Sequence, residues 1–311
     1  MAETKKYLDP AVLARIEKLG LRAQKVVEGA ISGLHRSPLH GVSVEFAEYR
    51  EYSPGDDLRR LDWRAYARTN RHFIKQYEEE SNLRATIFLD ASASMKYTGR
   101  GRAMSKFDYA ATLAASLAAL CVTQRDAVGM AVFDTAERVF VRPAATQAQL
   151  ARMIDVLERA KPERETELGG VMKQVCDKVR GRGVVVIISD LLCDLDAFYD
   201  GLGRLQYAGH EIMVFQVLDP DEIELPFKDS VLFKDIEGAE QLFAEPWAFR
   251  KAYKKAMEEF VAEVGRRCRF GGIDHLLLKT TDDLGTAMSH YLHGRQSAGL
   301  RRGGKVSGGG R

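Results

Sequence analysis

The sequence predicts an α/β protein whose core is a doubly wound, mostly parallel sheet. Short apolar runs alternate with segments of helical periodicity along most of the chain, which is the pattern of repeated strand–helix units. The apolar runs are continuous instead of alternating with polar residues, as is typical of strands covered on both faces. We therefore expect a sheet with helices on both sides, preceded by an N-terminal layer of helix and β-strand.

Composition limits the classes of function. The chain has 311 residues, of which 45% are hydrophobic, and this suffices for a sizeable core. Its formal net charge of +2 gives no general attraction for nucleic acid or an anionic membrane surface. The four cysteines are dispersed without metal-ligand spacing, which favours reduced thiols in a cytoplasmic protein. Met1–Leu8 is polar and Ala110–Val122 is too short to span a bilayer, so we expect neither a signal peptide nor a membrane span.

Residues 1–83 are expected to form the N-terminal layer, packed on the core. Asp9 and Pro10 are typical of a helix start, and apolar residues then recur at helical spacing as far as Leu34. His40–Tyr52 contains an alternating run that indicates a strand. Leu58–Tyr77 mixes arginines with aromatic residues, as a nucleic-acid surface does. Nearby acids favour pairing within the chain instead.

The core domain is expected over residues 84–293. The strands are predicted at Ala85–Leu89, Ala127–Phe133, Glu137–Val141 (an antiparallel edge), Val184–Ile188, Glu211–Leu218, Val231–Ile236 and Ile273–Leu278. The helices are predicted at Lys106–Gln124, Gln147–Arg159, Leu168–Arg180, Asp196–Tyr207, Pro246–Arg266 and Asp282–His293. Asp219–Pro226 is interpreted as a solvated acidic loop. Residues 294–311 are Gly-rich, basic and poor in apolar residues, which predicts a disordered tail.

Oxygen-bearing side chains follow the first core strand. That strand ends on Asp90, and Ser92 and Ser94 come next at a spacing of two. Ligands of open α/β sheets bind at the carboxyl ends of the strands. A carboxylate and two hydroxyls, with no His or Cys nearby, suit a hard cation such as Mg²⁺, with Mn²⁺ as a substitute. The simpler alternative is that the serines only cap a helix.

This Asp-x-Ser-x-Ser pattern resembles the metal-ion-dependent adhesion site of von Willebrand factor A domains. In that family a Thr and an Asp from later loops complete the site. The resemblance implies Thr166, which precedes a predicted helix, and Asp190, which follows the strand Val184–Ile188. The implied metal site is therefore made of Asp90, Ser92, Ser94, Thr166 and Asp190.

A longer resemblance starts in the N-terminal layer. The stretch Tyr49–Trp63, which contains Ser-Pro-Gly-Asp-Asp-Leu, together with Glu78-Glu79-Glu80 and Leu89–Met95, resembles the bacterial domain of unknown function 58 family. Members of that family are similar to von Willebrand factor A domains and are commonly encoded beside a MoxR-type AAA+ ATPase. The resemblance covers about His40 to Leu292 and implies such an ATPase as a partner.

We therefore expect a non-enzymatic protein-interaction module whose metal ion binds an acidic residue of a partner. Two other classes stay open, a metal-dependent hydrolase and a nucleic-acid-binding protein. The sequence contains no Gly-x-Ser-x-Gly or His-Glu-x-x-His motif and no phosphate loop of the Gly-x-x-x-x-Gly-Lys-Ser/Thr type. These observations favour the interaction module, which would assemble or remodel protein complexes with the ATPase.

Overall fold

The computed structural model describes the backbone of residues 43–51 and 73–80, and residues 83–134, 137–162, 171, 177–179, 181–234 and 241–288. Contacts divide the chain into two compact units, Leu39–Leu83 and the remainder. The predicted N-terminal helix, Thr166, most of the predicted helix Leu168–Arg180 and the C-terminal tail lie outside the described residues. The packing of an N-terminal layer on the core stays a prediction.

The core is a six-stranded sheet in the order β10-β7-β6-β3-β4-β5. Its strands are β3 (Arg84–Asp90), β4 (Ala127–Phe133), β5 (Glu137–Ala144), β6 (Val184–Ser189), β7 (Glu211–Leu218) and β10 (Asp274–Lys279). All neighbours are parallel except β5, which pairs antiparallel with β4 at the edge. The predicted doubly wound, mostly parallel sheet is thus confirmed, including its antiparallel edge. β3 lies in the middle, as its continuous apolar run predicted.

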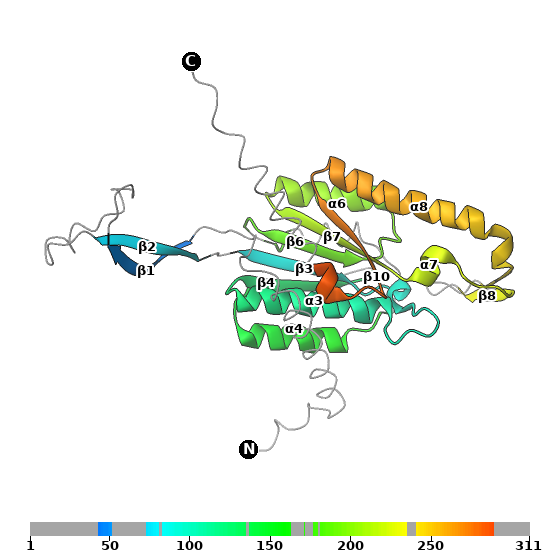
Figure 1. The fold of residues 1–311 in the computed structure, drawn as a ribbon, viewed down its shortest axis with the longest axis horizontal. Helices are drawn as coiled ribbons and strands as arrows, with labels where there is room; N and C mark the ends of the chain where they lie inside the picture. Colours follow the sequence, from blue (N-terminus) through cyan, green and yellow to red (C-terminus); the bar gives the residue numbers. More distant parts are fainter. Residues whose placement is uncertain are drawn as a thin grey trace, which may run out of the picture. The chain divides into compact units, whose positions relative to one another are not determined.

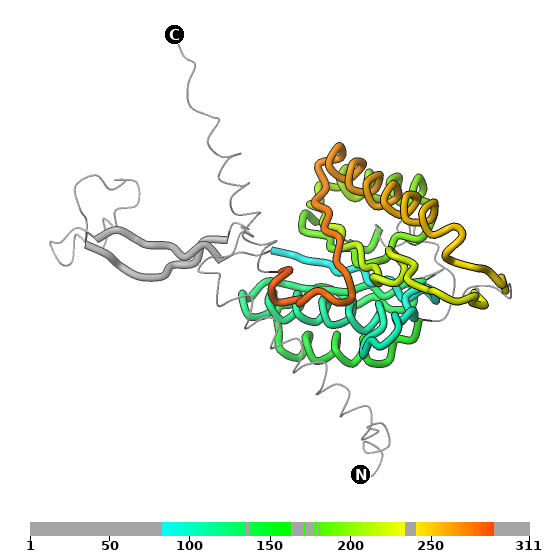
Figure 2. The backbone as a smooth tube through the Cα atoms, turned by 45° about the vertical axis from the view of Figure 1, so that its right-hand side comes forward, coloured from blue at the N-terminus to red at the C-terminus, as the bar shows by residue number. Residues whose placement is uncertain are grey.

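Helices cover both faces of this sheet (Figure 1). On one face lie α3 (Lys106–Thr123) and α4 (Gln147–Arg159), and on the other lie α6 (Leu195–Tyr207) and α8 (Pro246–Phe270). Figure 2 shows the same two layers from another side. On the α6 and α8 face, Phe88 of β3 packs in one buried cluster with Phe198 of α6 and Val264 of α8. No helix within the described ranges is both long and apolar enough to cross a membrane.

Two elements after β7 were not predicted. The acidic segment that follows β7 is the short helix α7 (Pro220–Glu224), and not a solvated loop. Asp219 caps it in a reciprocal pair with Glu222, and Pro220 occupies the first turn, where a missing N–H costs nothing. Further along, β8 (Val231–Lys234) pairs antiparallel with β9 (Gln241–Ala244), a strand that the sequence interpretation missed.

The smaller unit contains an antiparallel pair of strands, β1 (Ser43–Glu51) and β2 (Phe73–Glu80). β1 confirms the strand that was predicted within His40–Tyr52. β2 corrects the sequence interpretation, which had placed no strand in the Arg- and aromatic-rich segment. A shift of register between Phe46 and Glu48 interrupts the pairing, as a β-bulge does.

Candidate metal centre

The carboxyl ends of two neighbouring parallel strands build the site. Asp90 ends β3, and Asp190 directly follows β6, which pairs with β3. A single 3-10 turn, η2 (Ala93–Lys96), then places Ser94 near Asp190. The predicted residues come together because parallel strands bring their carboxyl ends to one edge of the sheet.

Hydrogen bonds connect four of the five predicted residues, Asp90, Ser92, Ser94 and Asp190, in that order, and we call this set the row. The Ser92 N–H donates to Asp90 Oδ1 over 2.9 Å, and the Ser92 and Ser94 hydroxyls lie 3.0 Å apart. Ser94 Oγ donates to Asp190 Oδ2 over 2.7 Å. The row thus runs from Asp90 to Asp190 across two loops. Thr166, the fifth predicted residue, lies outside the described residues.

The row contains two buried carboxyl groups. Asp90 and Asp190 have no solvent exposure. Burial, with the nearby charge of Asp190, raises the pKa of Asp90 to about 7, although hydrogen bonds from Ser189 and Ser92 favour the charged form. Two buried carboxylates at one strand edge therefore need positive charge close by.

Lys106 supplies one such charge and was missed by the sequence interpretation. Its Nζ lies 2.8 Å from Asp190 Oδ2 and 2.6 Å from Glu222 Oε1, and the side chain is fully buried. Burial alone would lower the pKa of Lys106, but the charges of Asp190 and Glu222 raise it above its usual value. The sequence did contain an indication that Lys106 has an acidic partner. Lys106 begins a helix, where the dipole disfavours a cation, and it stands in an apolar segment, so it needed a buried acid.

The acids around α7 are also neutralised inside the protein. Asp219 is buried and accepts hydrogen bonds from the Thr280 hydroxyl (2.6 Å) and the Gly99 N–H (3.3 Å). Arg102 Nε lies 3.6 Å from Asp219 and its Nη2 3.4 Å from Asp221. The loop after η2 and helix α7 are therefore held together by charge pairs. This pairing explains why the acidic segment is buried and not solvated.

The oxygen spacings of the row fit Mg²⁺. Octahedral coordination at 2.0–2.1 Å places neighbouring ligand oxygens about 2.9 Å apart. The Ser92–Ser94 and Ser94–Asp190 separations of 3.0 and 2.7 Å lie close to that value. Each Asp90 oxygen accepts one protein hydrogen bond, at 2.9 Å from Ser92 and 2.6 Å from Ser189, and keeps a further lone pair, so Asp90 can act on a cation directly or through water. In the described part of the chain no three His, Cys, Asp or Glu side chains gather as a metal site, so a cation here depends on the hydroxyls.

Comparison with known proteins adds a family match that covers these residues, and two sequence relatives. The family described as "Protein of unknown function DUF58" matches residues 48–263, which include Asp90 and Asp190. Uncharacterized protein Rv1480 of Mycobacterium tuberculosis is 30% identical over 298 residues, which are 94% of this chain and 92% of that protein. Uncharacterized protein MAV169 of Mycobacterium avium is 31% identical over 159 residues, 51% of this chain and 82% of that protein.

Solved structures show weaker similarity. An aerotolerance-related membrane protein from Bacteroides fragilis has a TM-score of 0.47 and 18% identity, and the match covers 70% of this chain and 99% of that one. The conserved hypothetical protein BatB from Bacteroides thetaiotaomicron has a TM-score of 0.44 and 17% identity, with 69% and 99% covered.

Proposed function

The chain belongs to the DUF58 family of proteins of unknown function, and from this premise we propose that it is a non-enzymatic protein-interaction module. In this proposal its metal centre binds an Asp or Glu side chain of a partner protein. The observation that carries the proposal is the hydrogen-bonded row from Asp90 through Ser92 and Ser94 to Asp190. A row of capping serines alone would not require two buried carboxylates at its ends.

Each residue of the row has a distinct part in the proposal. Ser92 and Ser94 bind Mg²⁺ directly, with Thr166 as the next ligand, direct or through water. Asp90 and Asp190 act directly or through bound water. When bound, the cation supplies a Lewis-acidic position for an external carboxylate. Because Lys106 already shares the charge of Asp190, the protein leaves the cation short of negative charge, and this favours an acidic ligand from outside.

The hydrogen bonding around Asp190 supports binding over hydrolysis. Asp190 Oδ2 accepts from both Ser94 (2.7 Å) and Lys106 (2.8 Å), and Oδ1 accepts the Leu192 N–H over 3.0 Å. The raised pKa of Lys106, which the two carboxylates produce against the effect of burial, keeps its amine protonated. The protonated Lys106 therefore cannot take a proton from Ser94, and Asp190, which accepts the Ser94 hydroxyl, is weakened as a general base by its pairing with the Lys106 ammonium.

The resemblance to proteins encoded beside a MoxR-type AAA+ ATPase suggests the setting. We infer that the ATPase and this module act together in the assembly or remodelling of other protein complexes. The module would recognise an acidic residue of a client or of the ATPase. A cytoplasmic location belongs to the same proposal.

The test joins metal binding with partner capture. Calorimetry with Mg²⁺ is run on the parent, on Asp90→Ala and on Asp200→Ala, an exposed control acid on α6. Capture of the purified MoxR-type ATPase is then compared in Mg²⁺ and in EDTA. We expect Asp90→Ala to lose both metal binding and Mg²⁺-dependent capture, and Asp200→Ala to keep both. Capture by Asp90→Ala at the parental level in Mg²⁺ would show that the adhesion-type mechanism is wrong.

A further inference from the structure

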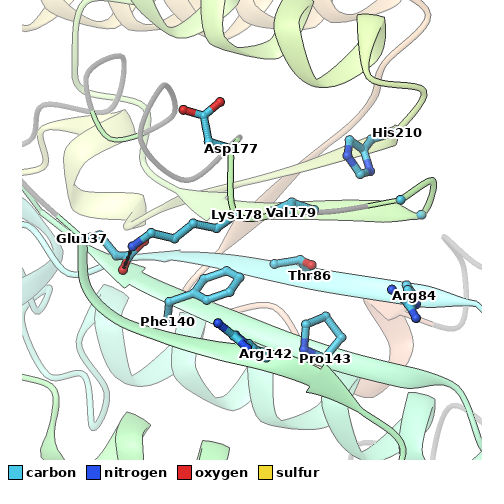
Figure 3. A pocket seen from close by; sticks show the side chains of 12 residues that line it. Arg84, Thr86, Glu137, Phe140, Arg142, Pro143, Asp177, Lys178, Val179 and His210 are labelled. Atoms are coloured by element: carbon cyan, nitrogen blue, oxygen red, sulfur yellow. Dashed lines mark hydrogen bonds and ion pairs between the residues drawn. The ribbon is translucent and has the colours of Figure 1, made fainter.

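A cavity lies at the amino ends of the parallel strands, whereas the metal centre lies at their carboxyl ends. Figure 3 shows the residues that line this cavity. Arg84 begins β3, Gly183 precedes β6 and His210 precedes β7, so the three residues mark the amino ends of parallel strands. The cavity measures about 650 Å³, within the range of about 300–1,000 Å³ that is common for small-ligand sites. None of its lining residues belongs to the row from Asp90 to Asp190.

The walls are fixed by close backbone packing. A Cβ on Gly183 would lie 2.2 Å from the Arg84 carbonyl oxygen, so only glycine allows this approach. The Glu211 N–H donates to the Gly183 carbonyl over 2.9 Å, which ties the next strand to the same place. On the other side, Phe140 of β5 packs on the core cluster and Pro143 continues the apolar wall.

The charges around the cavity are unbalanced. Lys178 pairs with Glu137 over 2.6 Å, so those two charges offset each other. Arg84 and Arg142 also line the cavity, and within the described ranges neither pairs with an acid. Asp177 is the other acid in the lining, and its side chain is exposed, as are those of Arg84 and Arg142. The described lining thus carries one more positive than negative charge, and the planar donors of the two guanidinium groups match carboxylate or phosphate oxygens.

His210 gives an independent indication of a missing ligand. Its side chain lines the cavity and is only 6% exposed, yet its Nδ1 has no hydrogen-bond partner among the residues that the structure describes. The backbone fixes its position, because the His210 N–H donates to the Leu205 carbonyl over 3.1 Å. Buried polar atoms nearly always have a partner. An imidazole nitrogen without a described partner, in the lining of the same cavity as two arginines without described acid partners, indicates that a polar group from outside completes the site.

We propose that this cavity binds a small organic anion. Its carboxylate or phosphate is held by Arg84 and Arg142, its apolar part lies against Phe140 and Pro143, and a polar atom bonds to His210. This site is separate from the metal centre and does not depend on it.

The test uses calorimetry with two anions, AMP and citrate, and with adenosine as the uncharged probe. The double variant Arg84→Gln/Arg142→Gln is compared with Arg152→Gln/Arg204→Gln, which removes the same charge from exposed helical positions on α4 and α6. We expect at least one anion to bind the parent with a dissociation constant of about 1 mM or lower. Affinity should fall about tenfold or more in the first double variant and stay parental in the second. Binding of AMP alone identifies a phosphate site, and binding of citrate alone identifies a carboxylate site.

A spectroscopic measurement separates this site from general charge effects. In side-chain NMR spectra the anion should shift the His210 resonances and leave those of His275, on β10, unchanged. Binding should persist in Asp90→Ala and in EDTA, so failure of the metal proposal would leave it intact. The inference is overturned if neither anion binds the parent, if both double variants lose affinity equally, or if adenosine binds as well as AMP.

Discussion

Lys106 and Asp190 form an ion pair of 2.8 Å in which both side chains are completely buried. Such a pair adds little net stability when intact, but removal of one partner leaves an uncompensated charge in the interior. Asp190 is also the acid to which Ser94 donates. Lys106 is therefore a resident cation at the site where we propose that Mg²⁺ binds, and the two cations share one carboxylate.

Replacement of this ammonium tests whether a metal can take over its charge. We expect Lys106→Met to lower the free energy of unfolding by about 3–5 kcal/mol in EDTA, because Asp190 and Glu222 lose their buried partner. Mg²⁺ should restore part of the loss. Urea denaturation with and without Mg²⁺ measures both effects.

Lys178→Met, which removes an exposed pair with Glu137, should cost at most about 1 kcal/mol and be insensitive to Mg²⁺. Equal instability of Lys106→Met in EDTA and Mg²⁺ would speak against a cation beside Asp190.

Asp90 and Ser92 should contribute unequally to the affinity for the metal ion. Asp90→Ala deletes a buried charge and the water that it would hold, so it should abolish Mn²⁺ binding in a relaxation titration. Ser92→Ala removes one neutral ligand and should only weaken binding. Asp200→Ala serves as the control, since its side chain is exposed on α6. A Ser92→Ala variant that binds less Mn²⁺ than Asp90→Ala would reverse the proposed roles.

Strand positions and the meeting of the site residues could be predicted because both depend on local pattern. Continuous apolar runs located β3, β4, β6 and β7, and the parallel arrangement follows from the helices between them. Asp190 was expected from the family resemblance, and it meets Asp90 because Asp90 ends β3 and Asp190 directly follows the neighbouring parallel strand β6.

The ion pairs of Lys106 and Arg102 could not be predicted from local sequence pattern. Lys106 pairs with Asp190 and Glu222, which are 84 and 116 residues away in sequence. Nothing in local periodicity encodes such a partner. For the same reason the acidic segment around Asp219 was interpreted as solvated, because its neutralising Arg102 lies in a distant loop. The short strand β9 was missed because it has only four residues, too few for a strand period to show in the sequence.

His275 should make stability depend on pH. Burial, assisted by Arg269, lowers the pKa of this imidazole, and its Nε2 lies 3.1 Å from Gln216 Oε1. Below pH about 6.5 the unfolded chain binds a proton that the folded protein resists, so stability falls as pH decreases through that value. Above it this contribution is fully present. In urea denaturation between pH about 5 and 7.5, the slope of stability against pH should therefore be more positive in the parent than in His275→Gln. An unchanged slope in that variant would assign the pH dependence to other groups.

Gly99 should be intolerant of any side chain. A Cβ at this position would lie 2.3 Å from Asp219 Oδ1, a carboxylate that is buried and bonded to Thr280 over 2.6 Å. Gly99→Ala must displace that acid or the loop, and we expect a loss of about 1–3 kcal/mol in the free energy of unfolding, as for other overpacked sites.

Gly203 on α6 provides the matched control, since a Cβ there meets nothing within 4 Å. Gly203→Ala should stabilise the protein by up to about 1 kcal/mol, because alanine is the better helix former. Thermal and urea denaturation of the two variants compare the same Gly→Ala change at a crowded position, Gly99, and at an open one, Gly203. If Gly99→Ala melts like Gly203→Ala, the loop after η2 does not pack on Asp219 in solution. The loop after η2 would then not connect the metal centre with α7. In that case the Mg²⁺ affinity of Gly99→Ala should equal that of the parent.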